Sequence, residues 1–519
     1  MRKTARLLES PRLAVALIFV FSAAHFIFLQ GWLHFKIGDF YFFRGDDVAR
    51  IAWAFNWLKA PYFMPTDDWL PLPTYLLGAV LAGHADPYFT PLFLSSLLTA
   101  GVLTVLGLIG LELFPDVPLL ALLPMSLATR VPYFEFLGLS AGAEIDLWFF
   151  SLLSLWFWLL YLRTNKTAYC LLNAACLFLA SMTRYEAWLY ILAFLPIAGL
   201  SFKLKKRPVR LALGYFLICV SYIVFFVCYQ ELHRSPSPQE FQGLPLSYRG
   251  IRDYFHGPDG GMGRSFLVPL RGWFSRAPVL ASMEVIGICH VFRKLPALRW
   301  YGVWAAVSLG ALCLEAGIFG IPMESKRLVV FFHLLLLPLA GGFLWEAMRL
   351  KTPSWCLLAA PTAAFLFLSG VLPRPEDSTC AWMPGCRDSS ILAKTVHDEE
   401  SQTRLFSNVL VELRPGPGPI VWDFTPFEFA AFDRFRADRL MKFRPGRSGS
   451  FLDTRDNPSI FSLPRPQLER YLSENRIGWI AVSSLEARAA VRGLAREVAT
   501  VGSRTLLNSG TFSTPSSYR

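Results

Sequence analysis

Two adjacent carboxylates and an arginine stand close together near the start of the chain, in the stretch FRGDDVARIAWAF. Asp46 and Asp47 precede Arg50, and a helix beginning here places Asp47 and Arg50 on one face. That face also carries apolar side chains, namely Ile51, Ala54, Phe55 and Leu58. An acid and a base on one face of a helix lying at a membrane surface suit chemistry on a phosphate-bearing lipid. The alternative is that Asp46 or Asp47 only caps the helix, because the helix dipole favours carboxylates at its N-terminus.

Two further stretches carry charge beside apolar runs. Asp67 and Asp68 form a second acidic pair in PTDDWLPLPTY, which also fits a plain turn before an interfacial segment. Arg184 and Glu186 lie in SMTRYEAWLY, at the junction of two apolar runs. Charges near hydrocarbon are costly, so Arg184 and Glu186 should face a cavity or charged neighbours, unless they reach out to the interface.

A third stretch, MESKRLVVFF, places Glu324, Lys326 and Arg327 directly before a late apolar run. A guanidinium can bind two phosphate oxygens at once, whereas a lysine acts as a point charge. This stretch therefore favours an anionic ligand, the alternative being a solvated loop. Ionisable residues in membrane spans are candidates for functional sites. Four more acids lie within or beside apolar runs: Glu135, Glu144, Asp146 and Glu315.

These side chains need a membrane-embedded scaffold. Hydrophobic residues make up 54% of the 519-residue chain and charged residues 17%, against roughly 25% in soluble proteins. Apolar runs of about 20 residues are long enough to cross the hydrocarbon core. We therefore expect an α-helical polytopic membrane protein with about eleven spans. The candidate spans are 13–33, 88–111, 117–135, 143–162, 167–182, 185–202, 209–229, 277–292, 300–320, 328–347 and 354–372.

The segment LPLPTYLLGAVLAG (70–83) decides the orientation of the spans. It is short and has two prolines near its start, which favours an interfacial or re-entrant segment over a span. If it does not cross, four basic loops lie on the side of the N-terminal MRK: 163–166, 203–210, 293–299 and 349–351. The positive-inside rule then makes that side cytoplasmic and the first loop, 34–87, external. If it does cross, the basic loops face outward; we expect the first arrangement.

The end of the chain reads as a separate domain. Residues 1–372 are expected to form the transmembrane domain, and residues 373–519 a soluble extracytoplasmic one. Within the latter, 419–424 and 477–484 read as buried strands and 466–475 as a helix. Strands alternating with helices predict a small α/β layer domain.

Charge and cysteine usage exclude some classes of partner. The net charge of +12 would hint at nucleic acid in a soluble protein, but here much of the excess lies in short loops between spans. The nine cysteines show no zinc-binding spacing. Cys380 and Cys386, outside any span, could form a disulfide if their side of the membrane is oxidising.

Taken in this order, the motifs resemble the GT-C superfamily of polytopic glycosyltransferases, which use lipid-phosphate-linked sugars. The likeness is to the bacterial aminoarabinose transferases of lipid A, the protein O-mannosyltransferases and related lipopolysaccharide sugar transferases. It rests on Asp46 and Asp47 with Arg50 in the first loop, on TRYEAW, and on KRLVVFFHLLLLPLAGG, and it covers roughly residues 1–372. Members often carry Asp-Glu in the first loop, so Asp47 in place of Glu leaves open which aspartate is catalytic.

The resemblance implies an inverting hexosyl- or pentosyltransferase of the cell envelope. Asp46 or Asp47 would accept the proton of an acceptor hydroxyl or amine, which attacks the anomeric carbon while polyprenyl phosphate leaves. The residues implied at the donor phosphate are Arg50, Arg184, Lys326 and Arg327. Those implied in support are Glu186, Asp67 and Asp68.

The resemblance also implies the partners. These are a polyprenyl-phosphate sugar, membrane lipid, and a lipid, glycan or protein acceptor, at a plasma (inner) membrane that the chain crosses several times. No cofactor is expected, although two acidic pairs in one loop could hold a divalent metal.

Other membrane proteins share some of these features. A transporter or lipid flippase also buries charges in its spans, but it would be expected to show related halves and broken helices, and the sequence has no such pairing. An O-antigen ligase or polymerase usually has its large external loop late in the chain, whereas here the acidic loop follows the first span. A non-catalytic envelope scaffold that binds through its outer domain is the remaining alternative.

Overall fold

The computed structural model describes a large part of the membrane region and part of the C-terminal region. The described residues are 10–36, 50–51, 54, 57–58, 61, 70–84, 89–115, 118–131, 134–140, 142–232, 270, 272–274, 277–294, 298–319, 330–340, 420–422, 464–474, 479–482, 485–501 and 504–508. Several residues singled out in the sequence lie outside them: Asp46, Asp47, Asp67, Asp68, Glu324, Lys326, Arg327, Cys380 and Cys386. The expected span 354–372 does as well.

The chain divides into two compact units. The first comprises 1–32, 65–73 and 95–389, and the second comprises 33–64, 74–94 and 390–519.

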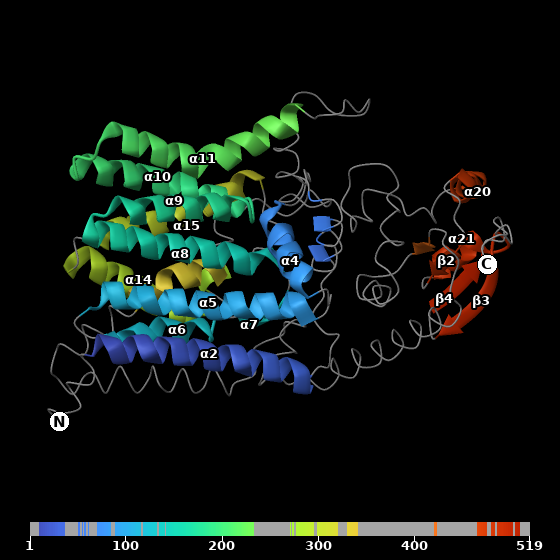
Figure 1. The fold of residues 1–519 in the computed structure, drawn as a ribbon, viewed down its shortest axis with the longest axis horizontal. Helices are drawn as coiled ribbons and strands as arrows, with labels where there is room; N and C mark the ends of the chain where they lie inside the picture. Colours follow the sequence, from blue (N-terminus) through green and yellow to red (C-terminus); the bar gives the residue numbers. More distant parts are fainter. Residues whose placement is uncertain are drawn as a thin grey trace. The chain divides into compact units, whose positions relative to one another are not determined.

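The first unit is a bundle of long apolar helices. Figure 1 shows α2, α5, α8, α9, α10 and α11 running alongside one another. The long helices are α2 (Pro11–Lys36), α5 (Phe89–Leu113), α8 (Ala143–Thr164), α9 (Thr167–Ser181), α10 (Glu186–Leu204), α11 (Val209–Leu232), α14 (Pro278–Lys294) and α15 (Arg299–Phe319). Five of them, within the described part of the chain, are long and apolar enough to cross a membrane: α2, α5, α8, α10 and α11. The chain is therefore a multi-pass membrane protein.

Buried polar side chains tie the helices of the bundle together. Asn173 on α9 donates from its Nδ2 to the carbonyl oxygen of Ser154 on α8, at 2.7 Å, and its Oδ1 accepts from the hydroxyl of Tyr215 on α11. Between α2 and α5, the hydroxyl of Thr104 lies 2.9 Å from that of Ser22. Such bonds are each worth roughly 0.6–2 kcal/mol in a membrane, where water cannot replace them. They fix which helix faces which.

Close backbone contact joins α14 to the helix Val330–Ala340. A Cβ atom at Gly287 would lie 2.2 Å from the carbonyl oxygen of Leu339 and 2.5 Å from its carbonyl carbon. Because both of these are backbone atoms, no side-chain movement would make room for a Cβ. Glycine therefore permits an approach between these two helices that no other residue would allow, as at other small-residue contacts in membranes.

One expected span is wrong. The run 117–135 forms a 3-10 turn, η1 (Pro118–Ala121), and a seven-residue helix, α6 (Leu122–Ala128), followed by the short helix α7 (Phe134–Leu139). At 1.5 Å per residue, α6 is only about 10 Å long, too short to cross the hydrocarbon core. The physical reason is the number of prolines in the run: η1 begins at Pro118, and Pro124 lies in the first turn of α6, where its missing N–H is tolerated.

The second unit contains most of the described part of the first loop, residues 70–73 belonging to the first unit. Arg50, Ile51 and Ala54 are helical and buried, as the helix expected at the acidic motif requires. Helix α4 (Leu72–Gly83) has twelve residues, about 18 Å, which fits a segment that does not cross the membrane. The two pack closely, since a Cβ at Gly78 would meet the ring of Trp57 at 2.6 Å.

The second unit also contains a four-stranded sheet. Its strands are β1 (Ile420–Trp422), β2 (Trp479–Val482), β3 (Arg496–Val501) and β4 (Arg504–Asn508), in the order β1-β2-β4-β3. β1 pairs parallel to β2, with Val421 opposite Ile480, and the other pairs are antiparallel. The expected strands 419–424 and 477–484 correspond to β1 and β2.

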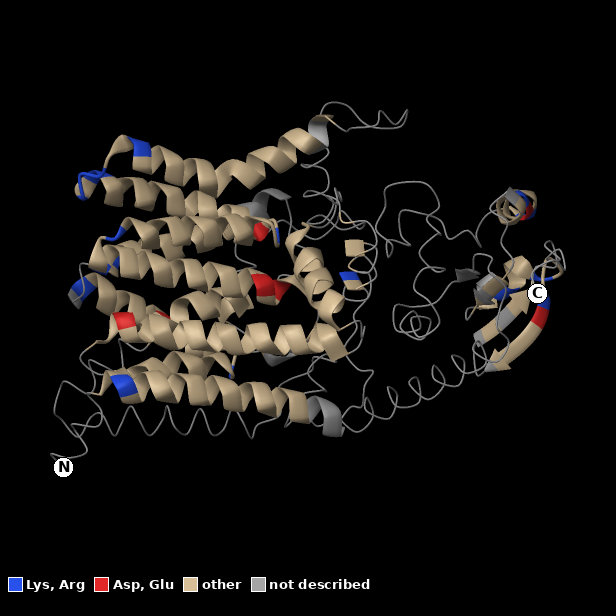
Figure 2. Ribbon diagram, viewed as in Figure 1, with Lys and Arg blue, Asp and Glu red and all other residues tan. Residues whose placement is uncertain are grey.

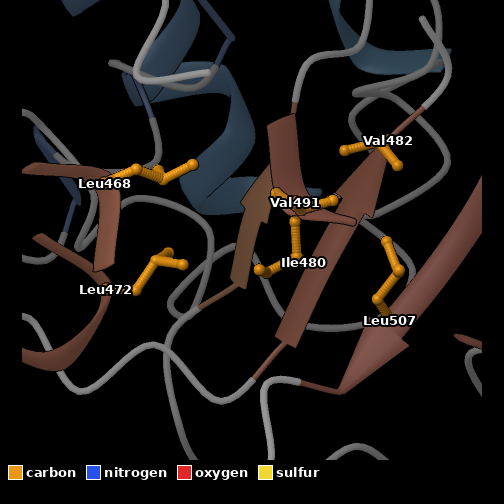
Figure 3. Packing of buried hydrophobic residues seen from close by; sticks show 6 residues of the cluster. All are labelled: Leu468, Leu472, Ile480, Val482, Val491 and Leu507. Carbon is orange, nitrogen blue, oxygen red and sulfur yellow. The ribbon is translucent and has the colours of Figure 1, made fainter. Parts of the chain in front are cut away.

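Two helices accompany the sheet. They are α20 (Arg465–Glu474), which matches the expected helix, and α21 (Leu485–Val491). Apolar side chains from α20, α21, β2 and β4 form one buried cluster, drawn in Figure 3. Its members are Leu468, Leu472, Ile480, Val482, Val491 and Leu507.

Candidate functional site

A buried arginine with two carboxylates lies where α9 turns into α10. The Nε of Arg184 is 3.0 Å from Oε2 of Glu186, and its Nη2 is 2.7 Å from Oε1 of the same residue. Its Nη1 donates to Oε1 of Glu144, at 2.9 Å. The side chains of Arg184, Glu144 and Glu186 are 8%, 3% and 2% exposed. The guanidinium is thus held in one orientation by charge-assisted bonds on two of its sides.

The local sequence explains how these residues meet. Helix α9 ends at Ser181, and the backbone N–H groups of Met182 and Thr183 bond back to Leu179 and Ala180, so the chain reverses at once. The indole N–H of Trp188 on α10 donates to the carbonyl oxygen of Ser181, at 2.9 Å. This contact closes the turn from its other side.

The carboxylates occupy helix N-termini. Glu144 and Asp146 lie in the first turn of α8, which starts after the extended Gly142, and Glu186 is the first residue of α10. The partial positive charge of a helix N-terminus favours carboxylates there. Figure 2 shows the acidic positions of α8 and α10 toward one end of the bundle, whereas the helix ends on the opposite side carry lysines and arginines. Asp146, 5% exposed, belongs to the same buried acidic end of α8.

The structure brings some of the expected site residues together. Arg184 and Glu186 are buried and paired, so the alternative that they reach out to the interface is wrong. Arg50, 5% exposed, lies on the first-loop helix in the second unit. The sequence marked Glu144 as an acid beside a span without identifying it as a partner of Arg184. The role of Arg184 and Arg50 at a phosphate stays a prediction, as does that of Asp46, Asp47, Asp67, Asp68, Lys326 and Arg327, which lie outside the described residues.

A second buried polar network was missed in the sequence. Glu284 on α14 and His333 on the helix Val330–Ala340 are both fully buried, and Nδ1 of His333 lies 2.9 and 3.1 Å from the two carboxylate oxygens. The indole N–H of Trp273 donates to Oε2 of Glu284, at 2.8 Å. The available signal was one acid in the apolar run APVLASMEVIGICHVF and one histidine in FFHLLLLPLAGG. Ionisable residues in spans are expected to pair, but spacing alone does not name the partner.

We expect Glu284→Gln to lower the free energy of unfolding by about 1–3 kcal/mol. The amide keeps an acceptor for Trp273 but puts an N–H group in place of the carboxylate oxygen that lies 2.9 Å from Nδ1 of His333. Thermal unfolding of the purified protein in detergent measures the change. The control is Glu469→Gln, because Glu469 and its partner Arg465 are 52% and 60% exposed, and exposed pairs are worth at most about 1 kcal/mol. Equal unfolding temperatures for the two variants would contradict a stabilising role for the Glu284 network.

Metal ligands are not grouped in the described part of the chain. Among those residues, no set of three or more His, Cys, Asp and Glu is placed to hold a metal ion. The acidic pairs of the first loop are not among them.

Comparisons with known proteins place the fold. No protein-family model matches the sequence, and no curated protein matches it. Among solved structures, the chain is similar to ArnT from Cupriavidus metallidurans bound to undecaprenyl phosphate, with 13% identity and a TM-score of 0.59, over 94% of this chain and 97% of that one. The same protein in its apo state matches with 12% identity and a TM-score of 0.53, over 96% and 98% of the two chains.

A third solved structure is the oligosaccharyltransferase of Archaeoglobus fulgidus in complex with Zn and sulfate. It matches with 11% identity and a TM-score of 0.51, over 91% of this chain and 68% of that one. At these identities the likeness shows the fold. The chain shares the fold of these solved structures over most of its length.

Proposed function

We propose that this chain is a membrane glycosyltransferase that moves a sugar from a polyprenyl-phosphate donor to an acceptor outside the cytoplasm. The observation that carries the proposal is the fold match along nearly the whole of both chains to a transferase structure whose name records bound undecaprenyl phosphate. A lipid-linked donor would also be consistent with the first-loop motif, because an acid and a base at the membrane surface suit a phosphate-bearing lipid.

In the proposed reaction, Asp46 or Asp47 accepts a proton from the hydroxyl or amine of the acceptor. The freed electron pair attacks the anomeric carbon, and the bond from that carbon to the phosphate oxygen breaks. The configuration at the anomeric carbon inverts, and polyprenyl phosphate leaves with the negative charge that forms on its oxygen. A positioned general base typically contributes 10²–10⁴-fold to the rate.

The growing phosphate charge needs fixed cations. We assign this role to Arg50, Arg184, Lys326 and Arg327, with Asp67, Asp68 and Glu186 in support. Glu186 and Glu144 support the assignment of Arg184, because they hold its guanidinium in place before any ligand arrives. Preorganised charges of this kind stabilise a transition state without the cost of reorganising at the moment of reaction.

The direction of the helices supports an extracytoplasmic reaction. Helix α8 carries Glu144 in its first turn and Arg163 in its last, and α10 begins with Glu186 and carries Lys203 in its last turn. The Arg184 network and the basic loops therefore lie at opposite ends of the same helices. If the basic ends are cytoplasmic, as the positive-inside rule predicts, the network faces the outside of a plasma membrane.

The proposal is tested by following the donor and the product together. The protein is reconstituted in liposomes with polyprenyl-phosphate sugars and a membrane extract as the source of acceptor. We expect polyprenyl phosphate to be released in step with the appearance of a new glycan, and mass spectrometry of envelopes with and without the gene to show the same glycan. Movement of the intact lipid-linked sugar across the bilayer without release of polyprenyl phosphate would instead assign a flippase.

A further inference from the structure

Two loops at the basic end of the bundle are joined into one surface. They are the loop between α8 and α9 and the loop between α10 and α11, and neither contains an acidic residue. We call the cations of these loops and of the adjoining helix ends the basic cluster: Arg163, Lys166, Lys203, Lys205, Lys206, Arg207 and Arg210. Basic loops by themselves only set the orientation of spans. Here side-chain contacts also hold the two loops together, which orientation alone does not require.

Two of the cations form that linkage. Lys205 donates from Nζ to the carbonyl oxygen of Leu162, at 2.8 Å, and Arg207 donates from Nη2 to the carbonyl oxygen of Asn165. Both cations also lie over the ring of the buried Tyr161, with Nζ of Lys205 at 5.0 Å and Cζ of Arg207 at 5.5 Å from its centroid. Contacts of this kind with an aromatic face are attractive. Lys205 and Arg207 thus hold the two loops together.

The electrostatics of the cluster favour an added anion. Burial, and then the nearby charge of Arg207, lower the pKa of Lys205, as expected where cations are crowded together. The buried Nε of Arg207 has no hydrogen-bond partner. The other five cations of the cluster are exposed. Among the described residues, Arg163 is the one cation of the cluster with an acidic partner. Its Nη1 lies 2.8 Å from Oε2 of Glu112.

The N-termini of two helices add positive charge to the basic cluster. Helix α9 begins at this surface, and its N-cap, Lys166, provides no side-chain acceptor for the backbone N–H groups of the first turn. Helix α11 begins there as well, at Val209. The positive ends of two helix dipoles therefore add to the side-chain charges. Because α8, α10 and α11 are long enough to span a membrane, this surface lies at the level of the lipid headgroups.

We propose that the basic cluster is a binding site for the phosphate headgroup of an anionic phospholipid in the adjoining leaflet. Lys205 and Arg207 join the loops, and the exposed cations, above all Lys166 and Lys203, meet the headgroup. Basic surfaces between helices at a membrane face bind anionic headgroups by this physics. The site is at the opposite helix ends from the Arg184 network, so the proposal does not depend on the glycosyltransferase assignment.

The test compares two doubly substituted proteins of equal charge. Lys166→Gln with Lys203→Gln removes one exposed cation from each side of the cluster, while Arg12→Gln with Arg293→Gln removes two exposed cations outside it. Each full-length protein in zwitterionic phosphatidylcholine micelles is titrated with phosphatidylglycerol, and its unfolding temperature is followed. A ligand that binds the native state raises that temperature with saturation.

We expect the midpoint of the titration to be on the order of 25-fold weaker in the cluster variant, at about fivefold for each lost cation, and unchanged in the control. Equal midpoints in the two variants would overturn the proposal, since the net charge of the protein, and not the basic cluster, would then determine how tightly the lipid binds. Equal stabilisation of the native protein by millimolar inorganic phosphate would overturn it too, because it would identify a free anion rather than a lipid as the occupant.

Discussion

Replacing Asp46 and Asp47 together by asparagine is expected to abolish sugar transfer while the protein still inserts normally into the membrane. Asparagine keeps the size and polarity of the side chain but cannot take up the proton of the acceptor. The loss should reach 10²–10⁴-fold, the usual contribution of a general base. The rate of release of polyprenyl phosphate in liposomes measures it, because this step accompanies bond cleavage.

The two single variants separate the roles of the pair. The aspartate that acts as the base should account for most of the loss, and its neighbour for little unless it orients the first. The control is Glu469→Gln on α20, which removes an equal charge from a 52% exposed side chain and should keep full activity. Full activity in both single variants and in the double variant would eliminate the proposed base.

Arg184→Met is expected to cost about 3–5 kcal/mol of unfolding free energy and to reduce transfer strongly. The substitution leaves the carboxylates of Glu144 and Glu186 buried without the guanidinium that neutralises them, which is the costly way to break a buried ion pair. Thermal unfolding in detergent and the amount of folded protein in the membrane measure the first effect. The transfer assay measures the second.

A triple variant separates a stabilising role of Arg184 from a role in binding the donor phosphate. Adding Glu144→Gln and Glu186→Gln to Arg184→Met removes the uncompensated charges and should restore much of the stability. If Arg184 also binds the donor phosphate, transfer stays low in the stable triple variant. Recovery of both stability and transfer would show that Arg184 serves only to hold the turn between α9 and α10.

The sequence predicted those parts of the molecule that depend on local pattern. The positions of α8, α9, α10 and α11 followed from runs of apolar residues, and the tight junction at Arg184 followed from the missing loop between two of them. The burial of Arg184 and Glu186 followed from the cost of placing charge near hydrocarbon. In the C-terminal region, β1 and β2 followed from short apolar runs.

What failed or was missed depends on contacts across the chain. The run 117–135 was apolar enough for a span, but its prolines set the start of a 3-10 turn and a short helix instead. Glu144 meets Arg184 across 40 residues, and Glu284 meets His333 across 49. From a single sequence one can infer that a charge within an apolar run needs a partner. Which distant residue is that partner cannot be inferred.

The parallel pairing of β1 with β2 bears on how the C-terminal sheet is made in the cell. β1 ends at Trp422, and its neighbour in the sheet begins only at Trp479. Chains are synthesised at about 5–20 residues per second, so several seconds separate the synthesis of β1 from that of β2. During that interval the backbone groups of residues 420–422 have no strand of this sheet to pair with. The β1–β2 pair can therefore form only after the chain has been made as far as Val482.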